Sequence, residues 1–302
     1  MHHADLWSLF ESGWGMSVTM IFGSFIAGAT SEGGGAVAFP AMTLLFDIRP
    51  AVARDFALMI QAVGMTAATI LIVAQGIKVE WRAVIFGSVG GTIGMALGLT
   101  AIAPEVPPAH AKIFFTSLWL SFALALYLVN RNRAREVLDA IHEFRPAHAA
   151  LLTSIGVLGG IVGSITGSGL DILTFSFLVL GLRISESIGT PTSVILMAAN
   201  AVVGTSWKCG VLGGMEPEAI RYWYVCIPVV VVGAPLGARF IRNMPRLYIA
   251  NFLYASILVQ FVFALLVIPL TPGLIFTSLL TLGAGSALFW WMGRLGGRPV
   301  AR

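Results

Sequence analysis

Two short stretches of the chain combine glycines with hydroxyl side chains, and a carboxylate lies within the first and directly after the second, which suits them to hold a ligand. They are Gly28–Gly35 and Gly163–Leu170, 135 residues apart. Three consecutive glycines follow Glu32 in the first stretch, and consecutive glycines break a helix. A broken helix inside an apolar segment exposes backbone N–H groups, and free amides at a helix start bind anions. The chemistry that these residues predict is non-covalent binding of a small anion.

Neutral hydrogen-bond donors gather at or near the two predicted breaks. Hydroxyls, amides and backbone N–H groups bind an oxyanion without supplying a permanent charge. Each hydroxyl taken alone is as well explained by a bond to its own helix, and the two buried amides by packing between helices. The predicted substrate-binding residues are Ser31, Gly33, Gly34, Gly35, Gln61, Thr166, Gly167, Ser168, Gly169, Thr190, Thr192, Ser193 and Asn200.

Charged residues complete the predicted site. A carboxylate inside a membrane segment, such as Glu32, costs about 2.5 to 3.5 kcal/mol and usually faces a cavity. Burial favours its protonated form, so Glu32 is a candidate proton carrier, and Asp171 is a weaker one. Capping of a broken helix is the alternative for both carboxylates. Arg54 and Lys208 are predicted to attract the anion, and either could instead pair with Glu32.

The composition places these residues in a membrane protein. Apolar residue types make up 57% of the 302 residues, and only 11% are charged, against about 25% in soluble proteins. This excludes a soluble enzyme and a disordered chain. The net charge of +4 comes from short loops, so no nucleic-acid partner is expected. The sequence has no enzyme or metal-binding motif, so neither an enzyme nor a cofactor is expected.

Charge-free windows predict eleven membrane segments, of which nine are long enough, or nearly so, to cross about 30 Å of hydrocarbon. The two short ones are Gly33–Phe46 and Ile172–Leu182, and each could cross or be re-entrant. Thr271–Gly273 divides the last window into two helices by its turn chemistry. The expected fold is an all-α polytopic membrane protein with about 9–11 membrane segments.

The most basic loop, Arg131–Arg145, is expected to be cytoplasmic. If every segment crosses, 13 basic residues lie inside and 5 outside. The N-terminus is then outside and the C-terminus inside a multi-pass protein of the cytoplasmic (inner) membrane. The predicted organisation is an extracytoplasmic N-terminus (1–13), a first membrane repeat (14–130), a basic cytoplasmic linker (131–148), a second membrane repeat (149–269), and a final helix with a cytoplasmic tail (270–302).

The two glycine-rich stretches have matching surroundings. Each follows a long apolar helix and precedes a short segment, whose polar loop leads into a helix with one buried amide. Five crossings per unit is an odd number, so the second unit is predicted to be inverted relative to the first. Inverted repeats place a binding site near the midplane, where broken or half-length helices meet. The glycines between Gly87 and Gly98 are better explained by close helix packing.

At these residues the sequence resembles a known family. Phe25–Pro40 resembles the first signature of the TauE/SafE sulfite exporters, also called TSUP anion permeases. Gly163–Asp171, followed by Gly189–Ser193, is similar to the second. The resemblance covers roughly residues 15–269.

This resemblance implies a secondary carrier that exports sulfite or small organosulfonates such as sulfoacetate. Alternating access, with coupling to protons as an option, is the expected mechanism, and an uncoupled anion channel is the alternative. The expected partners are a small sulfur-containing anion and the lipid bilayer. A homodimer is a further option that no sequence feature decides.

Overall fold

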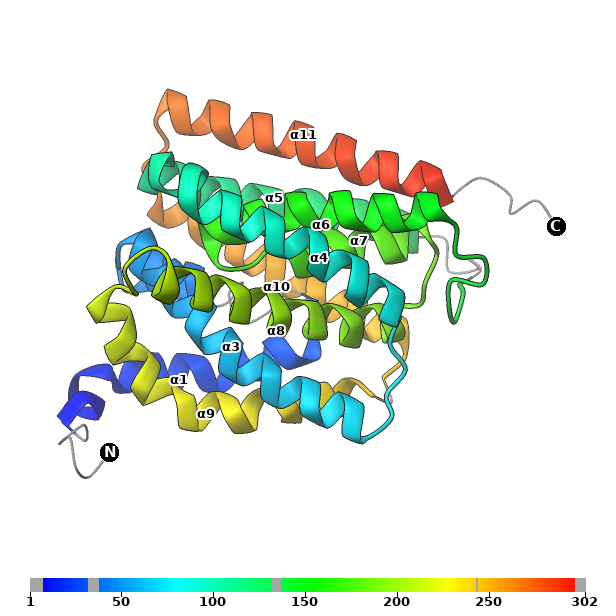
Figure 1. Ribbon diagram of the computed structural model, residues 1–302. Helices are drawn as coiled ribbons and strands as arrows, with labels where there is room; N and C mark the ends of the chain where they lie inside the picture. Colours follow the sequence, from blue (N-terminus) through cyan, green and yellow to red (C-terminus); the bar gives the residue numbers. More distant parts are fainter. Residues whose placement is uncertain (1–7, 32–37, 132–136, 243, 297–302) are drawn as a thin grey trace.

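The computed structural model is a bundle of helices that run between two ends of the molecule (Figure 1). It describes residues 8–31, 38–131, 137–242 and 244–296. Eight of the described helices are long and apolar enough to cross a membrane. Two shorter apolar helices, Gly13–Ala29 and Leu170–Gly181, accompany them. The predicted all-α polytopic membrane protein is confirmed.

The first half of the chain contains α1 (Ser8–Ala29), the π-helical turn η2 (Ala41–Leu45), α3 (Pro50–Ala74), α4 (Trp81–Leu97), its extensions η3 (Gly98–Ile102) and η4 (Ala103–Glu105), and α5 (Pro108–Asn130). Proline opens several of these helices because its fixed φ and missing N–H suit the first turn. Pro50 and Pro108 are two examples.

The second half contains α6 (Pro146–Thr166), α7 (Leu170–Ser176), η5 (Phe177–Gly181), α8 (Glu186–Gly210), α9 (Pro217–Ile241), α10 (Arg246–Val267) and α11 (Pro272–Gly296). The predicted division of the last apolar window is confirmed, because α10 ends before Thr271 and α11 begins at Pro272. Proline again opens α11, after a turn that breaks the helical hydrogen-bond ladder.

The same path of the chain occurs twice. α3 and α8 begin 136 residues apart, and so do η2 and η5. A residue with positive φ follows each π-helical turn, Asp47 (φ 51°) in the first half and Arg183 (φ 57°) in the second. The next residue closes the turn in both halves, since Ile48 N donates to a carbonyl at 2.8 Å and Ile184 N at 2.9 Å.

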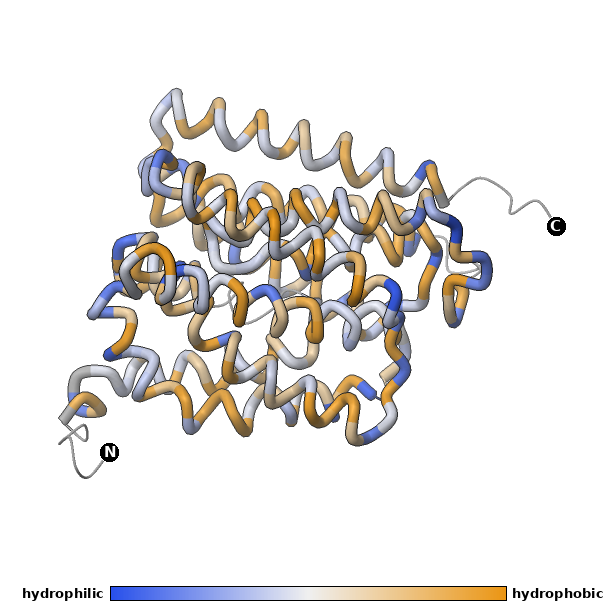
Figure 2. Tube along the Cα trace, viewed as in Figure 1, coloured by the Kyte–Doolittle hydropathy of each residue, from blue (hydrophilic) through white to orange (hydrophobic). Residues whose placement is uncertain are grey.

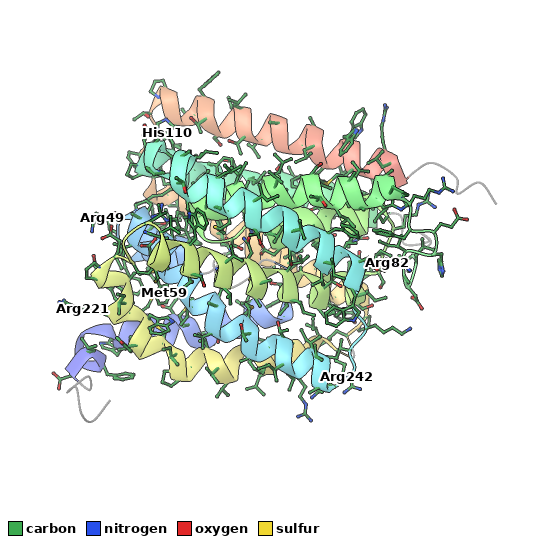
Figure 3. All side chains as sticks on the ribbon, viewed as in Figure 1. Arg49, Met59, Arg82, His110, Arg221 and Arg242 are labelled. Atoms are coloured by element: carbon green, nitrogen blue, oxygen red, sulfur yellow. The ribbon has the colours of Figure 1, made fainter. Side chains whose placement is uncertain are left out.

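The basic loops divide between the two ends of the bundle. Figure 3 shows Arg49, His110 and Arg221 at one end, called the Arg49 end below, and Arg82 and Arg242 at the other, called the Arg82 end. Hydrophilic residues gather at both ends (Figure 2). If every predicted segment crosses, Arg49 and Arg221 lie on one side of the membrane and Arg82 and Arg242 on the other, and the structure groups these residues in the same way. Which end faces the cytoplasm stays a prediction.

The linker belongs to the Arg82 end. Arg82 Nη1 donates to the carbonyl of Ile141 at 2.9 Å, and Glu80 accepts from the amide of Ile141 at 3.0 Å. Leu138 pairs with Ile184, just before α8. α8 therefore begins at the Arg82 end, whereas α3 begins beside Arg49. The opposite directions of these two helices support an inverted repeat, which stays a prediction.

Close packing of backbones joins α4 to α6. A methyl group at Gly94 would collide with the carbonyl oxygen of Val157, and one at Gly90 with that of Thr153. On α1, a methyl group at Gly28 would collide with a carbonyl of α9 in the same way. The glycines of α4 thus serve helix packing, as expected from the sequence.

Replacing Gly94 by alanine is expected to destabilise the protein. The new methyl group meets backbone, which cannot rotate aside, so α4 and α6 must separate. Overpacking of this kind costs about 1–3 kcal/mol, which a thermal unfolding midpoint in detergent would detect. Gly283→Ala on α11 is the control, because nothing lies within 4 Å of that position. Equal midpoints for both variants would contradict the expectation.

Candidate functional site

The second predicted break lies between α6 and α7. α6 ends at Thr166 and α7 begins at Leu170. Gly167 has a φ of +85°, where L side chains are rarely found, and a methyl group there would lie 2.5 Å from Cβ of Ala57 on α3. The chain turns back at this point, and α7 with η5 leads it to the Arg82 end. The predicted first break, with Glu32, Gly33, Gly34 and Gly35, lies outside the described residues.

Asp171 holds this break together. Its carboxylate accepts hydrogen bonds from Ser168 Oγ at 2.8 Å and from the amide of Gly169 at 2.7 Å. A carboxylate in a first helical turn that accepts amide protons satisfies backbone donors that the helix leaves unpaired. The geometry fits the capping alternative. This geometry is explained without any role for Asp171 in carrying protons, which stays a prediction.

Several predicted hydroxyls bond to nearby backbone. Thr166 donates to the carbonyl of Ser168 at 2.7 Å, and Ser193 donates to that of Thr190 at 2.8 Å. Thr192 donates to its own helix and accepts from the amide of Glu80 at 2.9 Å. These hydroxyls therefore stabilise the break and the helix ends. The hydrogen bond from Glu80 also links Thr192 of α8 to the loop before α4.

The two predicted amides flank the second break from different helices. Gln61 Nε2, on α3, donates to the carbonyl of Gly167 at 2.8 Å. Asn200, on α8, lies beside α6, since a methyl group at Gly163 would be 3.1 Å from its Nδ2. Both side chains are buried, with exposed fractions of 1% and 6%. The structure thus brings Gln61 of the first half close to Gly167 of the second half, and a shared binding site at this place stays a prediction.

Some of these buried polar atoms have no hydrogen-bond partner among the described residues. They are the hydroxyls of Ser31 and Thr190, Oε1 of Gln61 and Oδ1 of Asn200. Buried polar atoms are nearly always paired, and an unpaired one costs about 1–3 kcal/mol. The two hydroxyls can donate to an anion, and the two amide oxygens can accept from water or from a protonated oxyanion.

A cavity of about 420 Å³ lies beside the break. Its wall includes Ile165, which is two residues before Gly167, and the start of α3 and the end of α8 supply one cation each, Arg54 and Lys208. Thr100 of η3 adds a hydroxyl. The cavity belongs to the Arg49 end, because α3 begins there.

A buried carboxylate holds the two cations of this cavity. Asp55, whose side chain is fully buried, accepts from Lys208 Nζ at 2.6 Å and from Arg54 Nε at 3.1 Å. The amide of Glu216 also donates to Asp55, at 3.0 Å. Two cations share one carboxylate, so the cluster carries a formal net charge of +1 beside the cavity, which favours anions.

Asp55 is the functional candidate that sequence reasoning missed. A carboxylate next to an arginine in the sequence, as Asp55 is next to Arg54, is typical of an ion pair at a helix end. Among the described residues, Asp55 is the ion-pair partner of both Arg54 and Lys208, so it balances part of their charge. The available signal was a carboxylate within the first two turns of a long, largely apolar helix.

The comparison with known families identifies the family of the chain. A model of the sulfite exporter TauE/SafE family matches residues 16–264, from within α1 to near the end of α10. The chain belongs to the TauE/SafE sulfite exporter family. Neither a curated protein nor a solved structure matches it.

Membership in the TauE/SafE family makes the chain a membrane protein of an anion-export family, in keeping with the eight candidate spans found among the described residues. The TauE/SafE match ends within α10 and leaves out α11. All the described residues of the predicted site fall inside the matched range, and so does the Arg54–Lys208 cavity with its Asp55.

Proposed function

We propose that this TauE/SafE protein is a secondary transporter that exports sulfite or a small organosulfonate such as sulfoacetate across the cytoplasmic membrane. The observation that carries the proposal is the cationic cavity of Arg54 and Lys208 beside the turn at Gly167. A small oxyanion would be attracted by the cations, and the hydroxyls of Ser31 and Thr190, which have no hydrogen-bond partner among the described residues, are the neutral donors left to hold it. Binding is reversible, so the same groups serve loading and release.

Alternating access is the mechanism that we propose. The two helices that carry the cations, α3 and α8, pack against each other and run in opposite directions, and each also packs on a helix of the other half. Rocking of one half against the other would expose a shared site to each side in turn. In this proposal the Arg49 end faces outward and the linker faces the cytoplasm, because basic loops favour that side.

A flux screen with the purified protein in liposomes tests the function. Sulfite, sulfate, thiosulfate, sulfoacetate, isethionate and taurine would be compared across a pH step, with protein-free liposomes as the control. We expect flux of sulfite and of the anionic organosulfonates. Taurine carries a balancing ammonium group, so the net positive cavity should favour it least. Failure with every sulfur anion would overturn the proposal.

We further propose that Glu32 carries a coupled proton. Glu32→Gln cannot release a proton, so flux driven by a pH step should be lost or its pH dependence shifted, while exchange of anion for anion continues. Asp171→Asn is the comparison, because Asp171 already accepts two hydrogen bonds within its own turn. We expect that variant to lose stability and keep the pH profile. An unchanged profile in Glu32→Gln would favour an uncoupled channel or a structural role for Glu32.

A further inference from the structure

A second cavity lies at the Arg82 end, between the end of α5 and the start of α10. Its volume is about 220 Å³. α5 ends just before the basic linker, and α10 follows the loop that contains Arg242 (Figures 1 and 3). The cavity shares no lining residue with the Arg54–Lys208 cavity. The proposed transport site therefore does not account for it.

The walls of this second cavity are polar. The residues that line it are Tyr127, Asn130, Arg131, Leu247, Asn251 and Tyr254. Asn130 Nδ2 donates to the hydroxyl of Tyr254 at 3.1 Å, and the ring of Tyr254 meets that of Tyr127 edge to face at 5.9 Å. These contacts fix one wall, while Arg131 and Asn251 add a guanidinium and an amide. Guanidinium and amide groups donate to phosphate oxygens.

Exposed apolar side chains continue from this cavity toward the middle of the bundle. Leu124, one turn before Tyr127 on α5, is 50% exposed. Leu258 and Val262, one and two turns after Tyr254 on α10, are 57% and 48% exposed. A free anion would use only the polar walls, whereas a phospholipid would also place its acyl chains along these side chains. The arrangement of a polar mouth above apolar walls favours the lipid.

We propose that this cavity binds the phosphate headgroup of an anionic phospholipid. Arg131 contacts the phosphate, Asn251 donates a second hydrogen bond, and the two tyrosines lie at the level of the headgroups, where tyrosine is enriched. The acyl chains lie against α5 and α10. The site belongs to the leaflet at the Arg82 end, which also carries the basic linker.

Native mass spectrometry of the full chain, with added phosphatidylglycerol or phosphatidylcholine, tests this site. We expect phosphatidylglycerol to be retained preferentially, and Arg131→Gln and Asn251→Leu to reduce its retention, by about tenfold for the loss of the charged donor. Arg242→Gln is the matched control, because it removes an exposed charge at the same end but away from the cavity. Circular dichroism would verify that each variant is folded.

Three outcomes would overturn the proposal. They are equal retention of phosphatidylglycerol by Arg131→Gln and the unchanged protein, equal retention of the two lipids, and an equal loss in Arg242→Gln. A parallel titration with inorganic phosphate distinguishes the source of the ligand. Displacement of the lipid by phosphate would assign the cavity to a soluble anion instead. Retention in the presence of excess phosphate supports the lipid.

Discussion

Replacing Gly169 by leucine is expected to abolish anion flux while the protein still reaches the membrane. A methyl group at this position would lie 2.7 Å from Cγ1 of Val162 and 2.8 Å from the amide nitrogen of Gly163. The side chain would therefore push the start of α7 away from α6. The amide of Gly169, which bonds to Asp171, would move with it, and the break would lose its geometry.

Flux in liposomes and the amount of protein in isolated membranes would be measured together for Gly169→Leu. Gly283→Leu is the matched control, because that glycine has open space around it on α11. Gly169→Ala adds a milder step, in which only the methyl contact is introduced. Normal flux in Gly169→Leu would contradict a role for the break in transport. A fall in flux in proportion to the amount of protein would assign Gly169 to folding alone.

Replacing Lys208 by glutamine is expected to raise the apparent KM for the anion by at least about tenfold. Lys208 and Arg54 share Asp55, so loss of one cation lowers the formal charge of this cluster from +1 to zero. A hydrogen bond to a charged group contributes about 1.5–3 kcal/mol, which corresponds to tenfold or more in affinity. Initial flux rates at a series of anion concentrations would give the KM.

Asp55→Asn is expected to change the apparent KM for the anion in the opposite direction to Lys208→Gln. The cluster would carry a formal charge of +2, so the KM should fall. The free energy of unfolding should fall too, by about 3–5 kcal/mol, because Lys208 and Arg54 would lose the carboxylate that balances them in a largely buried site. Arg221→Gln is the control, since it removes an exposed charge at the same end of the bundle.

Because the KM is expected to rise in Lys208→Gln and to fall in Asp55→Asn, the two variants together test whether the charge of the cavity attracts the anion. Screening by salt should weaken the difference in KM between Lys208→Gln and Asp55→Asn. A change of KM in the same direction in both variants would contradict an electrostatic role for the cavity. A change in Arg221→Gln as large as that in Lys208→Gln would show that the charge of the whole end, rather than the cavity, attracts the anion.

Features that depend on local sequence were predictable. The second break was predictable from Gly167 and Gly169, because glycine is a poor helix former and readily adopts the positive φ that Gly167 has at the end of α6. The turn before Pro272 has the same local origin. The burial of Gln61 and Asn200 was predictable too, since each is an isolated amide in a long apolar helix.

Features that depend on the approach of distant segments were not predictable. Lys208 and Asp55 are 153 residues apart, and Gln61 and Gly167 are 106 residues apart. No local pattern indicates that Asp55, and not another carboxylate, lies within 2.6 Å of Lys208. The hydrogen bond from the amide of Glu80 to Thr192 likewise depends on how the loop before α4 packs against α8.

By itself the sequence determined that this chain is a bundle of membrane helices with a glycine break in a repeated setting, because hydrophobicity and helix breaking act over one or two turns. Only the tertiary structure decided which charges face each other and where cavities remain. Those outcomes arise from the packing of α3 against α8 and of α5 against α10, in which residues far apart along the chain become neighbours.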